Sequence, residues 1–68
     1  MSRDRKRLIM QLKRLRAKQG FSQAALSKRC GLTKEYIARL ELGQHDPSLS
    51  TLAKLAKALK VTVSELVK

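Results

Sequence analysis

The sequence is poor in the residues that build disulfide frameworks, aromatic cores and tight turns. Its 68 residues include one cysteine, one proline, three glycines, one tyrosine, one phenylalanine and no tryptophan. A lone thiol cannot close a disulfide within the chain, so a helical core and self-association must supply the stability. No apolar run approaches the roughly 20 residues that a membrane-spanning helix needs. These shortages exclude a disulfide scaffold and a membrane span.

Residues that carry out catalysis or bind metals are equally scarce. The chain has one histidine, His45, one cysteine, Cys30, and five scattered acidic residues. They make no nucleophile–base pair, no cluster of metal ligands and no glycine-rich phosphate loop. We therefore expect no enzyme activity, no cofactor and no metal. Cys30 is expected to be a small buried hydrophobe, and His45 a loop residue that is exposed or touches a phosphate.

Basic residues, in contrast, are abundant. Sixteen lysines and arginines against five acidic residues give a net charge of +11. Residues 1–18 alone carry eight basic groups, opposed only by Asp4. Such an imbalance attracts polyanions and exceeds what solubility requires. We expect nucleic acid as the partner, with phosphate contacts from the run Arg3–Arg7. Since no apolar segment of a signal peptide follows the basic start, we expect the cytoplasm, at the nucleoid.

The glycines and the proline divide the chain into five helix-sized segments. In the first, Leu8, Leu12 and Leu15 recur at helical spacing and form one apolar stripe. The expected helices begin near residues 3, 22, 33, 48 and 62, and the first three end near residues 18, 30 and 42. No strand is expected. The prediction is an all-α fold, with residues 1–68 forming one compact five-helix domain.

Polar residues with helix-capping chemistry stand where these segments begin. Ser22 and Thr33 precede the second and third segments, where a hydroxyl oxygen can accept a hydrogen bond from the first turn. Thr62 opens the fifth segment, with Glu65 three residues later, which is the spacing of a capping box. The capping residues support the same segment boundaries as the apolar spacing.

The second and third segments have the pattern of a helix-turn-helix motif. A turn of about three residues centred on Leu32 joins them, and Gly31 suits the left-handed conformation in which the first helix would end. On a helical wheel Leu40 and Thr33 fall beside Ile37 on the core face. The opposite half carries Lys34, Glu35, Ala38, Arg39 and Leu42, and the residues expected to point inward are Leu26, Cys30, Leu32, Ile37 and Leu40.

This string of residues resembles the phage repressor and Cro family of helix-turn-helix proteins, also called the XRE family. The resemblance covers about residues 8–67 and includes both helices after the motif, so it is far more specific than a helix-turn-helix pattern alone. It implies a repressor-like fold and a DNA partner. The matching residues are Leu15-Arg16, Phe21-Ser22-Gln23, Leu26, Gly31, Ile37, Leu40-Glu41, Gly43, Pro47-Ser48-Leu49, Thr51-Leu52, Leu55-Ala56, Leu59, Val61 and Leu66.

The family's functional positions carry over to several residues. The resemblance implies that Gln23 bonds a DNA phosphate and braces the recognition helix, and that Ser22 makes a neighbouring phosphate contact. It puts Lys34 and Glu35 at base-reading positions and Arg39 at another, one turn later. These roles agree with a recognition helix whose first residues meet base edges in the major groove.

The resemblance also pairs Arg16 with Glu41 in a partly buried salt bridge. The helical wheel supports the pair independently. Arg16 lies about 40° from Leu12 on the first helix, and Glu41 lies about 40° from Ile37 on the third. Both charges would therefore flank the core face.

Some positions depart from the family pattern or allow two roles. Lys34 and Glu35 replace glutamines of well-known phage repressors, so the operator of those repressors cannot be transferred. Lys34 suits guanine, while Glu35 could accept a hydrogen bond from cytosine or pair with Arg39. Leu42 could touch a thymine methyl group or a second subunit. Packing and a phosphate hydrogen bond are both open for Tyr36. The expected DNA contacts are Ser22, Gln23, Thr33, Lys34, Glu35, Tyr36, Arg39 and Gln44.

The sequence thus favours a small homodimeric transcription regulator, with repression as its expected mode. Two copies would place residues 33–42 in successive major grooves of a palindromic double-stranded operator. Apolar residues at the end of the chain would complete the core and form a symmetric dimer patch, although two cationic subunits repel. An antitoxin-like protein-interaction module that autoregulates its operon is the alternative. A cationic membrane-active helix is a third hypothesis.

Overall fold

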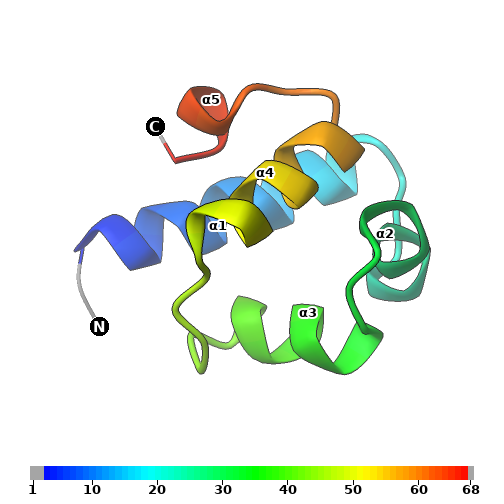
Figure 1. Ribbon diagram of the computed structural model, residues 1–68, viewed down its shortest axis with the longest axis horizontal. Coiled ribbons are helices and arrows are strands. Elements are labelled where there is room, and N and C mark those ends of the chain that lie inside the picture. The colour runs from blue at the N-terminus through cyan, green and yellow to red at the C-terminus, as the bar shows by residue number, and fades with distance from the viewer. Residues whose placement is uncertain (1–2, 68) are drawn as a thin grey trace.

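The computed structural model describes residues 3–67, and its architecture is all-helical (Figure 1). Five helices occur in this range, and it contains no strand, which confirms the predicted fold class. No helix within it is long and apolar enough to cross a membrane. The helices are α1 (Arg3–Lys18), α2 (Gln23–Cys30), α3 (Lys34–Glu41), α4 (Leu49–Ala58) and α5 (Val63–Val67).

Side-chain oxygens cap the starts of four helices. The side chains of Ser22, Thr33 and Ser48 each accept a hydrogen bond from a backbone amide in the first turn of α2, α3 and α4. At α5 the backbone amide of Glu65 donates to Thr62 Oγ1 at 3.0 Å, and the amide of Thr62 donates to Glu65 Oε1 at 3.1 Å. The predicted capping box is therefore confirmed, and the caps use amides that helices otherwise leave without partners.

Three helices end in the same backbone motif. After α1, α3 and α4 one residue adopts the left-handed conformation. The backbone amide of the residue that follows it donates a hydrogen bond of 2.9–3.0 Å to the carbonyl five positions before its own. This is the Schellman arrangement, in which glycine is the favoured left-handed residue because it has no Cβ. Gly20 and Gly43 occupy that position after α1 and α3, with φ of 73° and 80°. Lys60 occupies it after α4, with φ of 59°.

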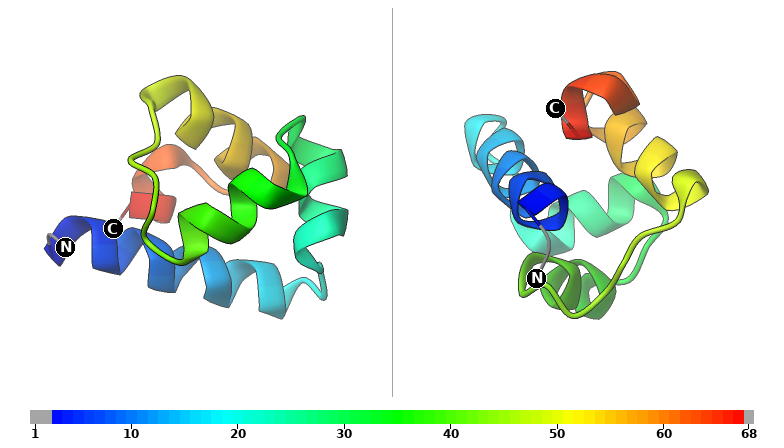
Figure 2. Two further views of the ribbon diagram at one scale, coloured as in Figure 1. Left: turned by 90° about the horizontal axis from the view of Figure 1, so that it is seen from below. Right: turned by 90° about the vertical axis from the view of Figure 1, so that its left-hand side faces the viewer.

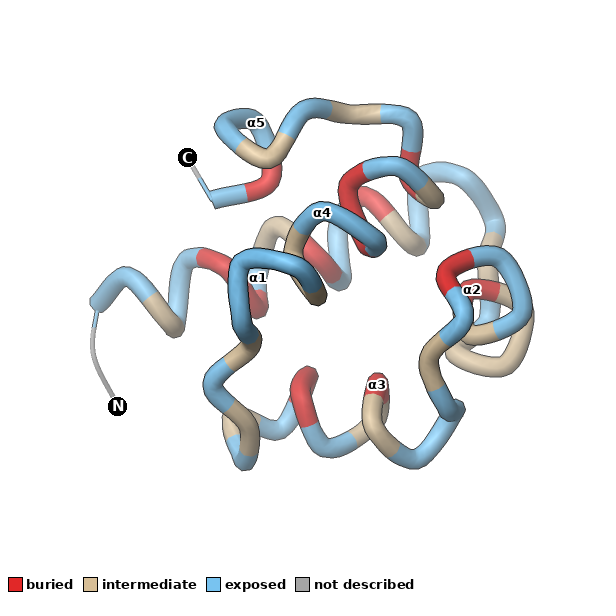
Figure 3. Tube along the Cα trace, viewed as in Figure 1, coloured by how far each residue is buried: buried red, intermediate tan, exposed pale blue. Residues whose placement is uncertain are grey.

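The core lies where the five helices meet. α1 packs against α3 and α5, α2 packs against α3 and α4, and α4 also packs against α5. Figure 2 shows this arrangement from two further directions, and Figure 3 shows that the buried residues face the interior. Cys30 belongs to this core, as predicted. The fully buried large side chains are Leu12, Leu26, Ile37, Leu40, Leu55, Leu59 and Leu66.

The helix-turn-helix differs from the predictions in detail. α3 ends at Glu41, with Leu42 as its C-cap, so the helix is one residue shorter than expected. Thr33 was predicted on the core face, and that placement is wrong because the residue is exposed. Its hydroxyl turns back to accept a hydrogen bond from the amide of Tyr36 at 3.0 Å, so it caps the helix instead of entering the core. Leu32 is only partly buried, although it packs against the core.

Candidate nucleic-acid interface

The third helix is anchored by its apolar side. Ile37 and Leu40, three residues apart, are both completely buried. The turn before α3 is short because Gly31 ends α2 with φ of 74°, and its amide donates to the carbonyl of Ser27. The chain then enters α3 at its threonine cap, so α3 crosses α2 as a rigid unit with one side covered. The opposite side remains open to other molecules.

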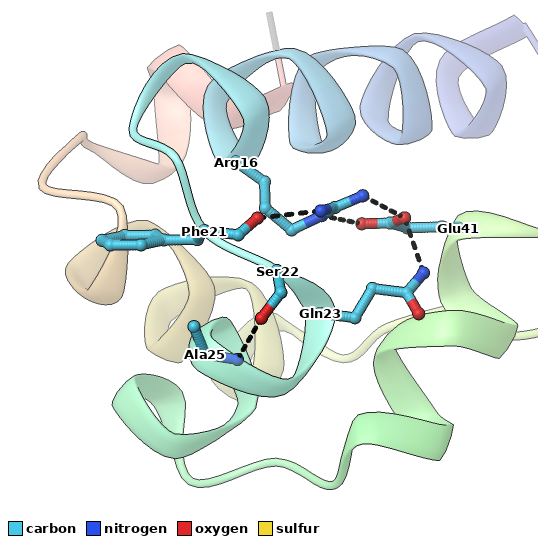
Figure 4. A network of polar contacts seen from close by, with 6 residues as sticks. All are labelled: Arg16, Phe21, Ser22, Gln23, Ala25 and Glu41. Carbon is cyan, nitrogen blue, oxygen red and sulfur yellow. Dashed lines mark hydrogen bonds and ion pairs between the residues drawn. The ribbon is translucent and has the colours of Figure 1, made fainter.

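A polar network ties three helices together beside this core (Figure 4). Arg16 on α1 donates from Nε to Glu41 Oε2 at 2.7 Å and from Nη2 to Glu41 Oε1 at 3.0 Å. Its Nη1 donates to the backbone carbonyl of Phe21 at 2.9 Å. Gln23 on α2 donates from Nε2 to Glu41 Oε1 at 3.0 Å. One carboxylate on α3 therefore accepts three hydrogen bonds, from α1 and α2.

This network fixes the orientation of α3. Glu41 is only 6% exposed, so its charge has lost most of its water and depends on these donors. The Arg16 side chain is also largely covered and makes the forked, two-bond contact that guanidinium and carboxylate geometry favours. The bond from Gln23 gives the bracing expected of that residue a specific partner. Sequence reasoning did not identify this bond, because it depends on how α2 crosses α3.

The polar face of α3, defined as Lys34, Glu35 and Arg39, points away from the core. All three residues are exposed. No hydrogen bond or ion pair to another residue in the range 3–67 involves their side chains, and Glu35 makes no ion pair with Arg39. Two cationic groups and one carboxylate are thus displayed with their full hydrogen-bonding capacity. Hydrogen-bonding groups on a rigid helix suit the edges of bases in a major groove.

The start of α2 adds hydrogen-bond donors near the network. Ser22 is exposed, and its Oγ accepts a hydrogen bond from the amide of Ala25 at 3.0 Å, which leaves its hydroxyl proton available to an external acceptor. Gln23 uses one of its two amide hydrogens on Glu41 and retains the other. Figure 4 shows both residues at the beginning of the same helix. Their available protons suit phosphate oxygens.

The loop after α3 is attached to α3 itself and to α1. The rings of Tyr36 and His45 stack with their centroids 4.6 Å apart and their planes 12° from parallel. Asp46 Oδ2 lies 3.2 Å from Arg5 Nη2 on α1. Gln44, predicted to contact DNA, is exposed at the start of this loop. The ring stack was not foreseen, since nothing in the spacing of two residues nine positions apart indicates that they meet.

Comparisons with known proteins agree with this arrangement. The helix-turn-helix family model HTH_3 matches residues 12–66. An uncharacterized HTH-type transcriptional regulator, y4dJ of Sinorhizobium fredii, is 41% identical over 54 residues, which are 79% of this chain and 70% of that protein. The immunity repressor protein of Bacillus phage phi105 is 36% identical over 56 residues, which are 82% of this chain and 39% of the repressor.

A solved structure matches almost from end to end. The crystal structure of the restriction-modification controller protein C.AhdI from Aeromonas hydrophila superposes with a TM-score of 0.89 at 35% identity. The match covers 96% of this chain and 98% of that one. The family model covers most of the chain. The chain therefore belongs to the helix-turn-helix family HTH_3, the XRE-type group of transcriptional regulators.

Proposed function

We propose that the protein is a homodimeric transcription regulator that binds specific double-stranded DNA sites by placing α3 in the major groove. The polar face of α3 carries this proposal. Its side chains are exposed and without partners within residues 3–67, while the other side of the helix is locked by Ile37 and Leu40. A helix held so firmly, with its donors and acceptor outward, is suited to reading base edges.

Each residue of the polar face has a base that fits its chemistry. Lys34 and Arg39 present donors that suit O6 and N7 of guanine, which are acceptors in the major groove. Glu35 presents an acceptor that suits N4 of cytosine, which is a donor there. Because Glu35 makes no ion pair with Arg39, its carboxylate keeps both oxygens for such a contact. We expect a site in which guanine and cytosine dominate the contacted positions.

Phosphate contacts then hold α3 in register. Ser22 and Gln23 supply their remaining protons at the start of α2, and Gln44 supplies an exposed amide after α3. Thr33 is exposed at the start of α3, where a phosphate or base edge comes close to the helix N-terminus. Tyr36 is half-buried against His45, a position from which its hydroxyl can reach the backbone of the duplex. Such contacts position the protein without selecting sequence.

The proposed dimer uses the end of the chain. Leu59 and Leu66 complete the core, whereas Val67 on α5 is 42% exposed and Met10 on the adjoining α1 is 67% exposed. These exposed apolar side chains are available to a symmetric contact. Because both subunits are strongly cationic, the free dimer is weak and forms on DNA. Bound at a promoter in the cytoplasm, such a dimer represses by occupancy.

Selection of bound sequences from a random pool of duplexes tests the proposal. The expected product is a palindromic site whose half-sites lie about 10 base pairs, or roughly 34 Å, apart. With about 6–10 phosphates neutralised by the dimer, the logarithm of the affinity falls against the logarithm of the salt concentration with a slope of roughly −5 to −9. A pool without any enriched motif, or affinity that hardly responds to salt, contradicts the proposal.

A further inference from the structure

A second cationic surface lies away from α3. Residues at the C-terminal ends of α2 and α4 line a hollow of about 580 Å³. In Figure 1 α3 runs along the lower edge of the molecule, whereas the end of α4 lies in the upper half beside α2. We name this surface the basic hollow. Its lining consists of Arg29, Cys30, Lys54, Lys57, Ala58 and Lys60.

The charges of the basic hollow are not balanced by the protein. None of the five acidic residues of the chain lines it. No ion pair within residues 3–67 involves Arg29 or any of the three lysines. The Arg29 guanidinium is held in place instead by the ring of Phe21, whose centroid lies 4.4 Å away. Basic residues in the last turn of a helix offset its dipole, but Lys54 lies in the middle of α4 and Lys60 lies beyond its end.

Lys60 supplies an independent indication that the hollow has a use. The same helix-ending motif follows α1, α3 and α4, with glycine at the left-handed position in the first two and lysine in the third. A side chain at that position strains the backbone, and glycine removes the strain. Backbone strain of this kind is enriched at functional sites, which makes Lys60 a candidate functional residue. Here the strained residue contributes one of the charges of the hollow.

We propose that the basic hollow binds the phosphate backbone of a second nucleic-acid duplex, so that one protein molecule bridges two DNA segments. The inference rests on the proposed function, since the first segment is the duplex that α3 reads. The occupant must be anionic, because all four charged residues of the lining are basic and no acidic residue lies among them. A duplex fits better than an acidic protein surface, because it carries one negative charge per about 1.7 Å of its axis and can balance four neighbouring cations.

The spacing of the cations suits a nucleic-acid strand. Lys54 and Lys57 lie three residues apart on α4, which is about 4.5 Å along the helix axis, and Lys60 follows the end of the helix. One strand of a duplex carries a phosphate about every 3.4 Å along its axis, so cations at this spacing can face successive phosphates. Arg29 adds a fourth cation from α2.

A bridging experiment separates the two proposals. A duplex carrying the selected site is fixed to beads and saturated with protein, and a short fluorescent duplex without the site is then added. Retention of the protein reports on α3, whereas retention of the fluorescent duplex reports on the hollow.

The test variant is Lys54→Gln, Lys57→Gln. Its matched control, Lys13→Gln, Arg14→Gln, removes the same charge from exposed positions of α1. A further variant, Lys60→Gly, removes a charge from the hollow and relieves backbone strain, so misfolding cannot explain a loss.

The expected result is retention of both protein and fluorescent duplex by the unaltered chain. Replacing Lys54 and Lys57 should lower retention of the second duplex about tenfold or more and make the salt slope of that step shallower by roughly 2, while the protein stays on the beads. The control should change bridging far less. Protein that stays on the beads without capturing the second duplex overturns this inference and leaves the proposed function intact. Capture of the second duplex that does not depend on Lys54, Lys57 or Lys60 also overturns the inference. So does binding of an oligoglutamate peptide that depends on these lysines while no second duplex is captured. Protein that does not stay on the beads overturns both proposals.

Discussion

Replacing Glu41 by glutamine tests how strongly the buried network stabilises the fold. The carboxylate accepts three hydrogen bonds, two from Arg16 and one from Gln23. The amide keeps one acceptor oxygen and turns an NH₂ group toward donors, so at least one bond is lost. It also leaves the Arg16 guanidinium without a counter-charge where its side chain is only 19% exposed.

The magnitude follows from the burial of these groups. A hydrogen bond to a charged group contributes about 1.5–3 kcal/mol, and breaking a buried ion pair costs about 3–5 kcal/mol. Because Arg16 retains some solvent contact, we expect the lower end, about 3 kcal/mol. For a domain of this size each kcal/mol shifts the melting temperature by about 4–8 °C, so Glu41→Gln lowers it by roughly 12–24 °C.

Thermal and urea unfolding followed by circular dichroism measure this effect. Glu35→Gln is the matched control, since it removes the same charge from an exposed position of α3 and should alter stability by less than about 0.5 kcal/mol. Replacing both partners with apolar residues, Arg16→Met with Glu41→Leu, should recover most of the loss. A melting temperature for Glu41→Gln within about 4 °C of the unaltered protein would refute the reasoning, because the carboxylate would then contribute almost nothing.

Four other substitutions test the scaffold and the polar face of α3 separately. Ile37→Ala should destabilise the fold by about 2–5 kcal/mol, measured by urea unfolding, because the side chain is completely buried. Lys34→Ala or Arg39→Ala should leave stability nearly unchanged but weaken binding to the selected site by about 1–3 kcal/mol and relax sequence preference, measured by competition with altered sites. Lys60→Gly should raise the free energy of unfolding by about 0.5–1 kcal/mol, because the relief of left-handed strain exceeds the added flexibility of the unfolded chain.

Each of these predictions has a result that would contradict it. A fully stable Ile37→Ala variant would mean that α3 is not anchored by its apolar side. An unchanged selected motif for Lys34→Ala and Arg39→Ala would show that the polar face of α3 does not read bases. A lower melting temperature for Lys60→Gly would show that the lysine makes stabilising contacts which outweigh the strain. Lys54→Gln, in the same hollow but within a regular helix, is the control for the last comparison.

Local chemistry made much of the fold predictable from the sequence. The first helix begins and ends where apolar spacing and Gly20 place it, because both signals act within a few residues. The capping box of Thr62 and Glu65 forms for the same reason. Thr33 shows the limit of a helical wheel, which treats the first residue as part of the helix. That residue has extended backbone, so its side chain points elsewhere.

Contacts between distant segments were harder to foresee. The burial of Arg16 and Glu41 beside the core was within reach of the wheel, but the bond from Gln23 to Glu41 depends on how α2 crosses α3. The stack of Tyr36 on His45 depends on the path of an irregular loop, for which residue spacing offers no rule. The basic hollow likewise forms only because the ends of α2 and α4 come together. Nothing in the sequence indicated that Lys54 and Lys57 share a surface with Arg29.

The side chains on the polar face of α3 contribute little to the stability of the fold that supports them. Its side chains make no internal bond within residues 3–67, whereas the anchoring side chains of the same helix are buried or take part in the network. Exchanging Lys34, Glu35 or Arg39 should therefore change which operator is preferred without endangering folding. A gene duplicate of this protein could acquire a new set of targets through a few such replacements, and an engineer could redirect it in the same way.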